Sequence, residues 1–245
     1  MTRVFGEVAA IYDEARQGYP DDLLAAVTGY HGGVPASVAD VGAGTGKGTG
    51  LLLRLGVPVT AVEPDPRMAA VLTRKFPQVE VANAAFEDWT PPPGGVGLLA
   101  CATAWHWMDE RTRERRARTA LVPRGTLAVF HNSHGYAVPR QKDAIDAIHQ
   151  AIDPTPTVDD REVAWARGGI ERSGLFADVE VHEWHRHPVL TTEQYLRLLQ
   201  TFSTFRNHSA RDRKTVVANL SAAIDGFGGA VEMDIHTVLV LARAA

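Results

Sequence analysis

Four closely spaced glycines follow a short apolar run and form a candidate binding loop. The run Val38–Val41 leads into the string GAGTGKGTG, which contains Gly42, Gly44, Gly46 and Gly48. Glycine lets the backbone turn sharply after a buried strand and lets a ligand approach the first turn of the next helix. The order therefore predicts a strand, a tight loop and a helix, with a nucleotide-like ligand at the loop.

Two common phosphate-binding patterns do not match this loop. A Walker loop has a glycine five residues before its Gly-Lys pair and Ser or Thr directly after it, whereas Val41 and Gly48 occupy those places here. A dinucleotide fold has GxGxxG, whereas these glycines fall as GxGxG with Asp40 two residues ahead. A Walker loop is therefore disfavoured, and a dinucleotide remains an alternative to another adenosine cofactor.

An acidic residue stands at the end of the second predicted strand. Glu63 follows the apolar run 57–62 and lies 21 residues after Gly42. A carboxylate at this place can accept hydrogen bonds from both hydroxyls of a ribose. The spacing suits an adenine dinucleotide and other adenosine cofactors equally, so Glu63 does not choose between them.

Aromatic residues and a histidine follow the fourth predicted strand, 97–102. Trp105, His106 and Trp107 would lie at the end where parallel sheets bind their ligands. Aromatic rings there suit a pocket wall that faces a cation, and His106 has the residue type of a general base. A histidine that orients the loop or contacts a cofactor is the alternative. His134, near the fifth strand, is a weaker candidate for substrate contact.

The string HEWHRHP contains His182, His185 and His187 and raises the question of a metal site. On a strand, His182 and His185 face opposite sides, and no carboxylate or cysteine set completes the ligands. We therefore expect no metal.

Composition limits the classes of protein that remain. The 245 residues include 25 Lys and Arg against 29 Asp and Glu, which gives a net charge of −4 and argues against a general nucleic-acid binder. No apolar run reaches the ~18 residues of a membrane span, and acidic residues interrupt any signal-peptide core. Cys101 is the single cysteine and cannot form an internal disulfide. We expect a cytoplasmic protein. The arginine-rich run 111–118 is expected to form a solvated helix face.

Alternating elements must position these residues. Strands are predicted at 38–41, 57–62, 79–82, 97–102 and 126–131, and helices at 68–76 and 110–121. Such alternation with short connections indicates a parallel sheet with right-handed crossovers. Beyond residue 136, helices are predicted at 140–152, 192–202 and 211–224, and strands at 179–184 and 233–241. The last strand is expected to close the sheet.

Taken together, the motifs resemble those of class I S-adenosylmethionine-dependent methyltransferases. The strings VADVGAGTGKGT and AVEPDPRM are similar to the first two motifs of that family, and NAAFEDW, ATAWHWMD and YDEARQGYP extend the resemblance over most of residues 5–135. Relatives usually have proline where this chain has Gln17. The resemblance is strongest to the small-molecule group that includes trans-aconitate methyltransferases.

The resemblance implies a fold and a cofactor site. The fold would be α/β, a Rossmann-like doubly wound sheet of seven strands, mostly parallel with an antiparallel last strand, and helices on both faces. The cofactor would be S-adenosyl-L-methionine, with Asp40 beneath its methionine part, Glu63 on its ribose and Arg16 on its carboxylate. The implied cofactor-binding residues are Tyr12, Arg16, Tyr19, Asp40, Gly42, Ala43, Gly44, Gly46, Glu63, Pro64, Met68, Ala85, Phe86, Thr103 and His106.

We therefore expect a methyltransferase that transfers a methyl group to an O, N or C nucleophile of a small metabolite, with His106 as the candidate base. A single domain is expected over 1–245, with an N-terminal lid (1–35), a cofactor-binding core (36–135) and a substrate-side elaboration (136–245). Neither nucleic acid nor membrane is expected as a partner, and the protein would be a monomer or homodimer. The alternatives are an NAD(P)-dependent oxidoreductase and a cofactor-binding protein without catalytic activity, such as a regulatory subunit.

Overall fold

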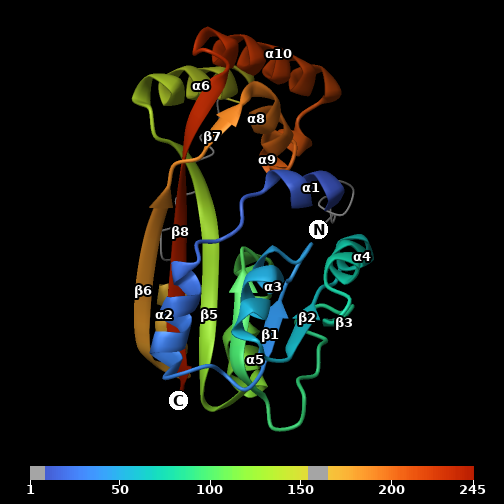
Figure 1. Cartoon of the computed structure of the whole chain (residues 1–245), viewed down its shortest axis with the longest axis vertical. Coiled ribbons are helices and arrows are strands. Elements are labelled where there is room, and N and C mark those ends of the chain that lie inside the picture. Colours follow the sequence, from blue (N-terminus) through green and yellow to red (C-terminus); the bar gives the residue numbers. More distant parts are fainter. Residues whose placement is uncertain (1–8, 154–164) are drawn as a thin grey trace. The chain divides into compact units, whose positions relative to one another are not determined.

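The computed structural model describes residues 9–153 and 165–245, which divide into two compact units (Figure 1). The sheet unit contains the described residues of 18–132, 165–184 and 237–245. The helical unit contains those of 9–17, 133–153 and 185–236. The chain crosses from one unit to the other at several points, and three of these lie within strands. The strands are β5 (Leu121–Tyr136), β6 (Phe176–Arg186) and β8 (Ala230–Ala244).

The described residues form an eight-stranded sheet whose main order is β3-β2-β1-β4-β5-β8-β6. The remaining strands of this order are β1 (Val38–Val41), β2 (Val59–Val62), β3 (Glu80–Ala82) and β4 (Val96–Ala102). Strands β1 to β5 pair in parallel, whereas β8 runs opposite to β5 (Figure 1). The mostly parallel α/β sheet with an antiparallel last strand is thus confirmed, but the predicted count of seven strands is one too few for the described residues. The eighth strand is β7 (Val189–Thr191), which pairs antiparallel with β8 and is too short to show an alternating pattern.

Helices cover both faces of the sheet. Successive strand residues point to opposite sides, so one strand packs against both layers of helices. On β4, Leu98 and Ala100 belong to the core that includes α2 (Asp22–His31) and α3 (Lys47–Leu52). Their neighbours Leu99 and Cys101 belong to the core that includes α5 (Arg113–Ala120) and α7 (Trp165–Ser173). Burial on both sides explains why β4 is an almost continuous apolar run.

The helix α4 (Pro66–Lys75) shows how local sequence sets an element's start. The Asp65 side chain accepts a hydrogen bond from the backbone N–H of Arg67 at 2.9 Å, and Pro66 occupies the first turn. An Asp cap followed by proline is a favoured helix start. The helix therefore begins two residues before the predicted 68–76. Two 3₁₀ turns, η2 (Leu53–Leu55) and η3 (Trp105–Trp107), complete the short elements of the sheet unit.

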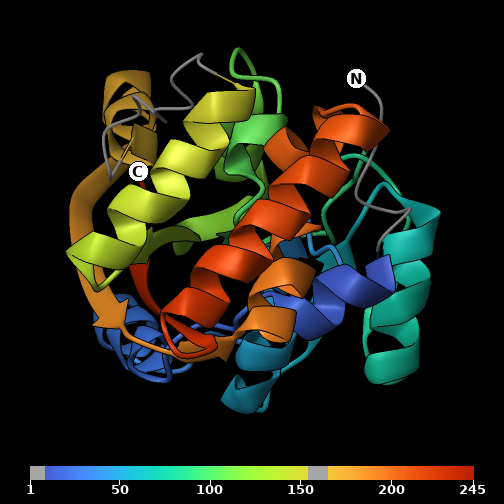
Figure 2. The ribbon, with the colours of Figure 1, turned by 90° about the horizontal axis from the view of Figure 1, so that it is seen from above.

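The helical unit has a separate apolar core. Buried residues of α6, α8, α9 and α10 pack with the inward side chains Val231, Met233 and Ile235 of β8. Figure 2 shows α10 lying along α6. Helix α8 begins with a capping box between Thr191 and Gln194. The helices of this unit are α1 (Ala9–Ala15), α6 (Pro139–Ile152), α8 (Thr192–Leu199), α9 (Ser203–Asn207) and α10 (Ala210–Gly226).

Within the two described stretches of chain, no helix is both long enough and apolar enough to cross a membrane.

Candidate active site

Three predicted site segments meet at one edge of the sheet. The glycine loop follows β1, Glu63 follows β2, and Thr103 to His106 follow β4. Strand β1 lies between β2 and β4, and Asp40 is in register with Ala61 on one side and Ala100 on the other. The strand order reverses at this point, and parallel sheets bind ligands outside the strand ends where such a reversal occurs.

Three of the four glycines are required by packing within the protein, and a Cβ atom on Gly48 would lie 2.7 Å from the Cβ of Ala102. Gly42 and Gly46 have φ values of 70° and 85°, which strain any residue with a side chain. A Cβ atom on Gly42 would lie 2.4 Å from the Cβ of Ala104, and one on Gly46 would lie 2.9 Å from Cε2 of Phe76. All four glycines were predicted to serve ligand binding. Packing alone also requires these three, so their presence does not test that prediction.

Gly44 differs because its missing side chain leaves space. Its φ is 57°, and a Cβ atom there would meet only Sδ of Met68, at an ordinary contact distance of 3.7 Å. Its backbone N–H donates to Oε2 of Glu63 at 2.8 Å. The other carboxylate oxygen of Glu63, Oε1, accepts from the backbone N–H of Asp65 at 2.8 Å. The buried Glu63 therefore fastens the glycine loop to the end of β2, a role that its position in the sequence did not reveal.

Asp40 is fully buried at the base of the loop. It accepts a 2.7 Å hydrogen bond from the hydroxyl of Thr49. Burial raises the pKa of Asp40 to about 7, and the charge of Glu63 adds to this effect while the bond from Thr49 opposes it. A neutral carboxylic acid at this position could donate as well as accept a hydrogen bond.

Three buried polar atoms around these loops have no hydrogen-bond partner within the described part of the chain. They are Oδ1 of Asp40, Oγ1 of Thr45 and Nε1 of Trp105. Buried polar atoms in folded proteins are nearly always satisfied by protein, water or ligand. One donor, one acceptor and one hydroxyl, together with the open side of Gly44, fit a polar cofactor bound at this edge.

A strained residue begins the turn after β4. Thr103 has a φ of 57°, and such a conformation costs a β-branched residue on the order of 1–3 kcal/mol. Its N–H donates to the carbonyl of Phe130 at 2.8 Å, and its hydroxyl lies 2.8 Å from that of Tyr19. The Tyr19 ring packs edge-on against Phe130, with 4.7 Å between ring centroids. Tyr19 and Thr103, both predicted site residues, are thus in contact, and Tyr19 supports the turn after β4.

The turn continues into η3, where the two tryptophans differ. Trp105 is buried, whereas Trp107 is half exposed. The partly buried ring of His106 lies 4.8 Å from the Trp107 ring and 6.1 Å from the Trp165 ring, centroid to centroid. The two indole rings thus form an aromatic wall beside His106 in the turn after β4.

Part of the arginine-rich run lies beneath this wall and is buried. Arg113 and Glu114 are 6% and 8% exposed and form a 2.9 Å ion pair. The Arg113 guanidinium donates to the carbonyl of Trp105 at 3.1 Å and lies 5.5 Å from the ring centroids of both Trp105 and Trp165. The expectation of a solvated helix face is wrong for these two residues, because an ion pair and two aromatic rings compensate their burial.

The residues predicted to lie near the adenine differ in burial and in what they pack against. Met68 is buried on α4 beside Gly44, Pro64 and Ala85 are partly buried, and Ala43 packs in a small core with Leu72. Phe86 is also buried, but its ring belongs to the sheet core, where it stacks on Trp89 at 6.4 Å. The Phe86 side chain is therefore largely used in packing.

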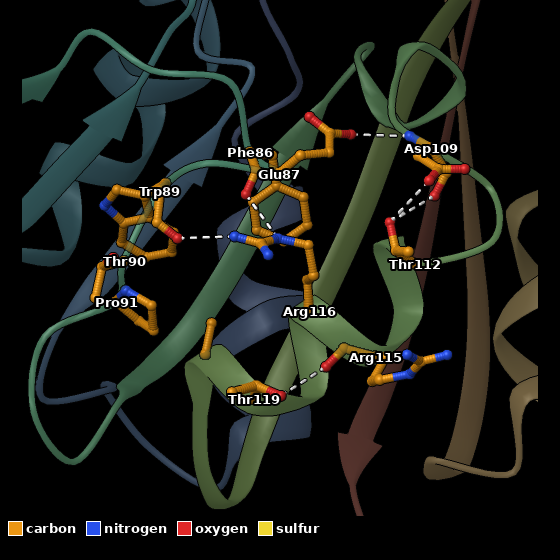
Figure 3. A pocket seen from close by; sticks show the side chains of 11 residues that line it. Phe86, Glu87, Trp89, Thr90, Pro91, Asp109, Thr112, Arg115, Arg116 and Thr119 are labelled. Carbon is orange, nitrogen blue, oxygen red and sulfur yellow. Dashed lines mark hydrogen bonds between the residues drawn. The ribbon is translucent and has the colours of Figure 1, made fainter.

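A pocket of about 550 Å³ lies between α5 and the segment 86–91 (Figure 3). Arg116 donates to the carbonyls of Phe86 and Trp89, at 2.9 and 3.0 Å, and Glu87 accepts from the N–H of Asp109. These bonds tie the pocket walls to each other, so we assign no ligand to it.

Tyr12 and Arg16 belong to the helical unit, and their surroundings are described within that unit alone. Arg16 donates from Nε to the Thr201 hydroxyl at 2.8 Å and lies 4.1 Å from the ring centroid of Phe202. Tyr12 lies nearby, with its ring centroid 5.3 Å from the guanidinium. The structure thus groups Arg16 with Tyr12 and with two residues of the C-terminal half that were not predicted as its neighbours.

His134 lies in the same unit, with its ring edge-on to Phe202 at 5.2 Å. Burial lowers the pKa of His134 to about 3, and the charges of Arg16 and Arg186 act in the same direction. The imidazole is therefore neutral at ordinary pH.

Two residues that support the site were missed from the sequence. The Asn83 side chain donates to the backbone carbonyl of Glu63 at 2.7 Å, and Thr49 holds Asp40. Both residues lie inside the quoted motif strings, but side-chain partners across 9 or 20 residues of sequence cannot be read from spacing alone.

The fold and this edge define a Rossmann-like α/β protein: a parallel sheet, a glycine loop after its first strand, and a carboxylate after its second. A family model described as a methyltransferase domain matches residues 38–125. An uncharacterised methyltransferase of Mycobacterium tuberculosis is 29% identical over 178 residues, which cover 67% of this chain and 71% of the relative.

Solved structures are similar in fold. A protein of Anaeromyxobacter dehalogenans, described as a type II methyltransferase, has a TM-score of 0.66 at 21% identity and covers 93% of this chain and 97% of its own. Phosphoethanolamine N-methyltransferase 2 of Haemonchus contortus, in complex with S-adenosyl-L-methionine, has a TM-score of 0.58 at 16% identity, over 99% of this chain and 58% of that one. The methyltransferase-domain match and the methyltransferase relatives support an S-adenosylmethionine-dependent methyltransferase. The oxidoreductase alternative is not favoured.

Proposed function

We propose that the protein binds S-adenosylmethionine at the glycine loop and transfers its methyl group to a small-molecule acceptor. The observation that carries the proposal is the bond pair of Glu63, which fixes Gly44 and Asp65 around an open position at the switch point of the sheet. Each carboxylate oxygen has more than one lone pair, so Glu63 can hold the loop and also accept from ribose hydroxyls.

The other predicted residues would surround the same cofactor. Gly42, Ala43, Gly44 and Gly46 would line its methionine part above Asp40, and Pro64, Met68, Ala85 and the Phe86 backbone would contact the adenine. Tyr19 would act by holding Thr103, beside the turn that carries His106. For Tyr12 and Arg16, the family resemblance supports contact with the cofactor's carboxylate.

When bound, the cofactor supplies an electrophilic methyl group on a sulfonium. The chain's own contribution is to hold the acceptor's nucleophile close to that group and in line with it, which is the main source of rate in such a transfer. His106 would take a proton from a weakly acidic acceptor, whereas a carboxylate acceptor would need no base.

The remaining expectations belong to this proposal. The helical unit, with His134, Phe202 and Arg16 packed together, would contribute to acceptor selection. We propose one methyltransferase domain over 1–245, a cytoplasmic monomer or homodimer, and a small metabolite as acceptor. The net charge of −4 supports an acceptor other than nucleic acid.

Calorimetry and a transfer assay with two pairs of variants test the proposal. Glu63→Gln cannot accept from both backbone N–H groups, so its affinity for S-adenosylmethionine should fall at least tenfold, about 1.4 kcal/mol. Glu80→Gln, which replaces an exposed carboxylate on β3, is the matched control. His106→Ala should leave cofactor affinity near that of the wild type and lower kcat, with His182→Ala as its control.

Transfer would be followed as S-adenosylhomocysteine release across a panel of metabolites. A wild-type chain that binds NAD but not S-adenosylmethionine would overturn the proposal. Cofactor binding without transfer to any acceptor would favour the non-catalytic alternative, and unchanged turnover of His106→Ala would leave positioning alone as the mechanism.

A further inference from the structure

Two histidines and an aspartate meet on the surface of the helical unit. His185 lies in β6, His187 follows that strand, and Asp234 lies in β8. Nδ1 of His185 is 2.8 Å from Oδ1 of Asp234, and Nε2 of His187 is 3.4 Å from the same oxygen. One donor atom from each residue lies within 4.8 Å of the other two. Asp234 is distant in sequence from both histidines, so the string HEWHRHP did not reveal it as their partner.

The backbone holds the three side chains on one face. His185 and His187 are two residues apart along extended chain, so they point the same way. Pro188 restricts the backbone of His187, and the Pro188 carbonyl accepts from the N–H of Met233 at 3.0 Å, directly beside Asp234. Because Met233 is buried, its neighbour Asp234 faces outward. The groups are therefore brought together by strand registration before any ion is present.

The exposure of the three groups leaves them open to solvent ions. The side chains of His185 and His187 are each 51% exposed, and that of Asp234 is 29% exposed. A second ring from β8, His236, stacks on His185 with 4.3 Å between centroids and 8° between planes. This stacking limits the directions in which the His185 ring can turn.

Two imidazole nitrogens and one carboxylate oxygen are the donor set of borderline divalent metals such as Zn²⁺, whereas Mg²⁺ and Ca²⁺ prefer oxygen alone. Tetrahedral Zn²⁺ with bonds of about 2.0–2.2 Å places its ligand atoms about 3.4 Å apart. The 3.4 Å contact to Asp234 matches that spacing, whereas the 2.8 Å contact is a hydrogen bond that an ion would replace. All three ligand atoms lie within 4.8 Å of one another, so side-chain movements would complete the site.

We propose that His185, His187 and Asp234 bind one divalent transition-metal ion, with Zn²⁺ as the probe. Three protein ligands would leave one coordination position for water or another small ligand. The ligands come from two segments that are distant in sequence, so the ion would link the end of β6 to β8 inside the helical unit. The proposal is independent of the cofactor site and departs from the expectation that this chain has no metal site.

Zinc titration of the full-length, tag-free protein tests the proposal. After dialysis against a chelator and its removal, calorimetry should give one Zn²⁺ per wild-type chain. Asp234→Asn keeps the size of the side chain but removes its charge, and His187→Ala removes one nitrogen. Both should weaken Zn²⁺ binding at least tenfold. His182→Ala, an exposed histidine of the same strand paired with Glu180, should bind as the wild type does.

Cobalt absorption provides a second, spectroscopic measurement that is independent of the calorimetric heat of binding. Co²⁺ substituted into the wild type should give visible absorption bands of a four- or five-coordinate site, and Asp234→Asn should lose them. Melting curves without metal should show that the variants remain folded, as expected for positions open to solvent. Absence of stoichiometric binding to the wild type, or equal weakening in His182→Ala, would overturn the proposal.

Discussion

Asp40 is a residue at which burial and ionisation oppose each other. Its side chain is fully buried, one oxygen accepts from Thr49, and the other has no partner among the described residues. Enclosing a carboxylate in this way favours its protonated form. The sequence could place an acid before the glycine loop, but its protonation depends on packing by residues distant in sequence.

The raised pKa of Asp40 predicts a pH dependence of stability. Between its ordinary value of 3.8 and its folded value of about 7, the folded chain keeps a proton that the unfolded chain has released. The free energy of unfolding should therefore fall as pH rises through this range and level off above it. Asp40→Asn removes the effect, so its stability relative to the wild type should rise from about pH 4 to pH 7, by at most about 4 kcal/mol.

Urea denaturation at several pH values measures this difference. Asp88→Asn, which replaces an exposed carboxylate of the sheet unit, controls for the change in net charge. A wild-type and Asp40→Asn difference that stays constant from pH 4 to pH 8 would show that Asp40 keeps an ordinary pKa.

At the scale of elements, substitutions of two glycines can distinguish the effect of backbone strain from the effect on cofactor binding. Gly44 has a left-handed backbone and open space, and Gly56, after η2, has a φ of 72° and no atom within 4 Å of where a Cβ would lie. Either residue replaced by alanine should lose about 1–2 kcal/mol of unfolding free energy from backbone strain alone. Only Gly44→Ala should also weaken S-adenosylmethionine binding, because its methyl group would enter the proposed cofactor site.

The comparison requires both a melting curve and a calorimetric titration for each variant. Equal cofactor affinity in Gly44→Ala and Gly56→Ala would place the cofactor away from Gly44. A loss of affinity in both would indicate that backbone strain, and not the occupied space, is responsible.

Elements with a clear local pattern could be predicted from sequence, and those without one could not. Strand β1 spans Val38–Val41 as expected, because four buried residues directly precede a glycine. Strand β5 begins at Leu121, earlier than the predicted 126, since Pro123 and Gly125 indicate a turn while parallel pairing with β4 extends the strand. The contact of Arg113 with two tryptophans depends on helix α7, which no sequence pattern linked to it.

At the scale of the whole molecule, the two units were not apparent in the sequence. Composition marks a boundary where a flexible linker joins two parts, but here the division falls within β5 and β8 and near the end of β6. The arrangement of the site residues after β1, β2 and β4 was predictable, because parallel strands bring their carboxyl ends to one edge.

Cofactor binding should raise the thermal stability of the molecule. A ligand that binds only the folded state adds about 2.7 kcal/mol at a hundred times its Kd, which corresponds to about 5–10 °C in Tm for a chain of this size. Scanning calorimetry with S-adenosylmethionine or S-adenosylhomocysteine measures the shift, and NAD at the same concentration is the control. If the units melt separately, the transition of the sheet unit should move; a Tm indifferent to both ligands would argue against the proposed site.

The approach of the glycine loop to the turn after β4 also limits how this sequence can evolve. With 2.4 Å between Ala104 Cβ and a Cβ at position 42, an enlargement of residue 42 could be accommodated only by shrinking residue 104. Alanine can shrink only to glycine, which would loosen the turn that carries His106. Paired substitutions at positions 42 and 104 are therefore hardly tolerated. Substitutions at this site are expected instead at residues such as Met68, which border open space.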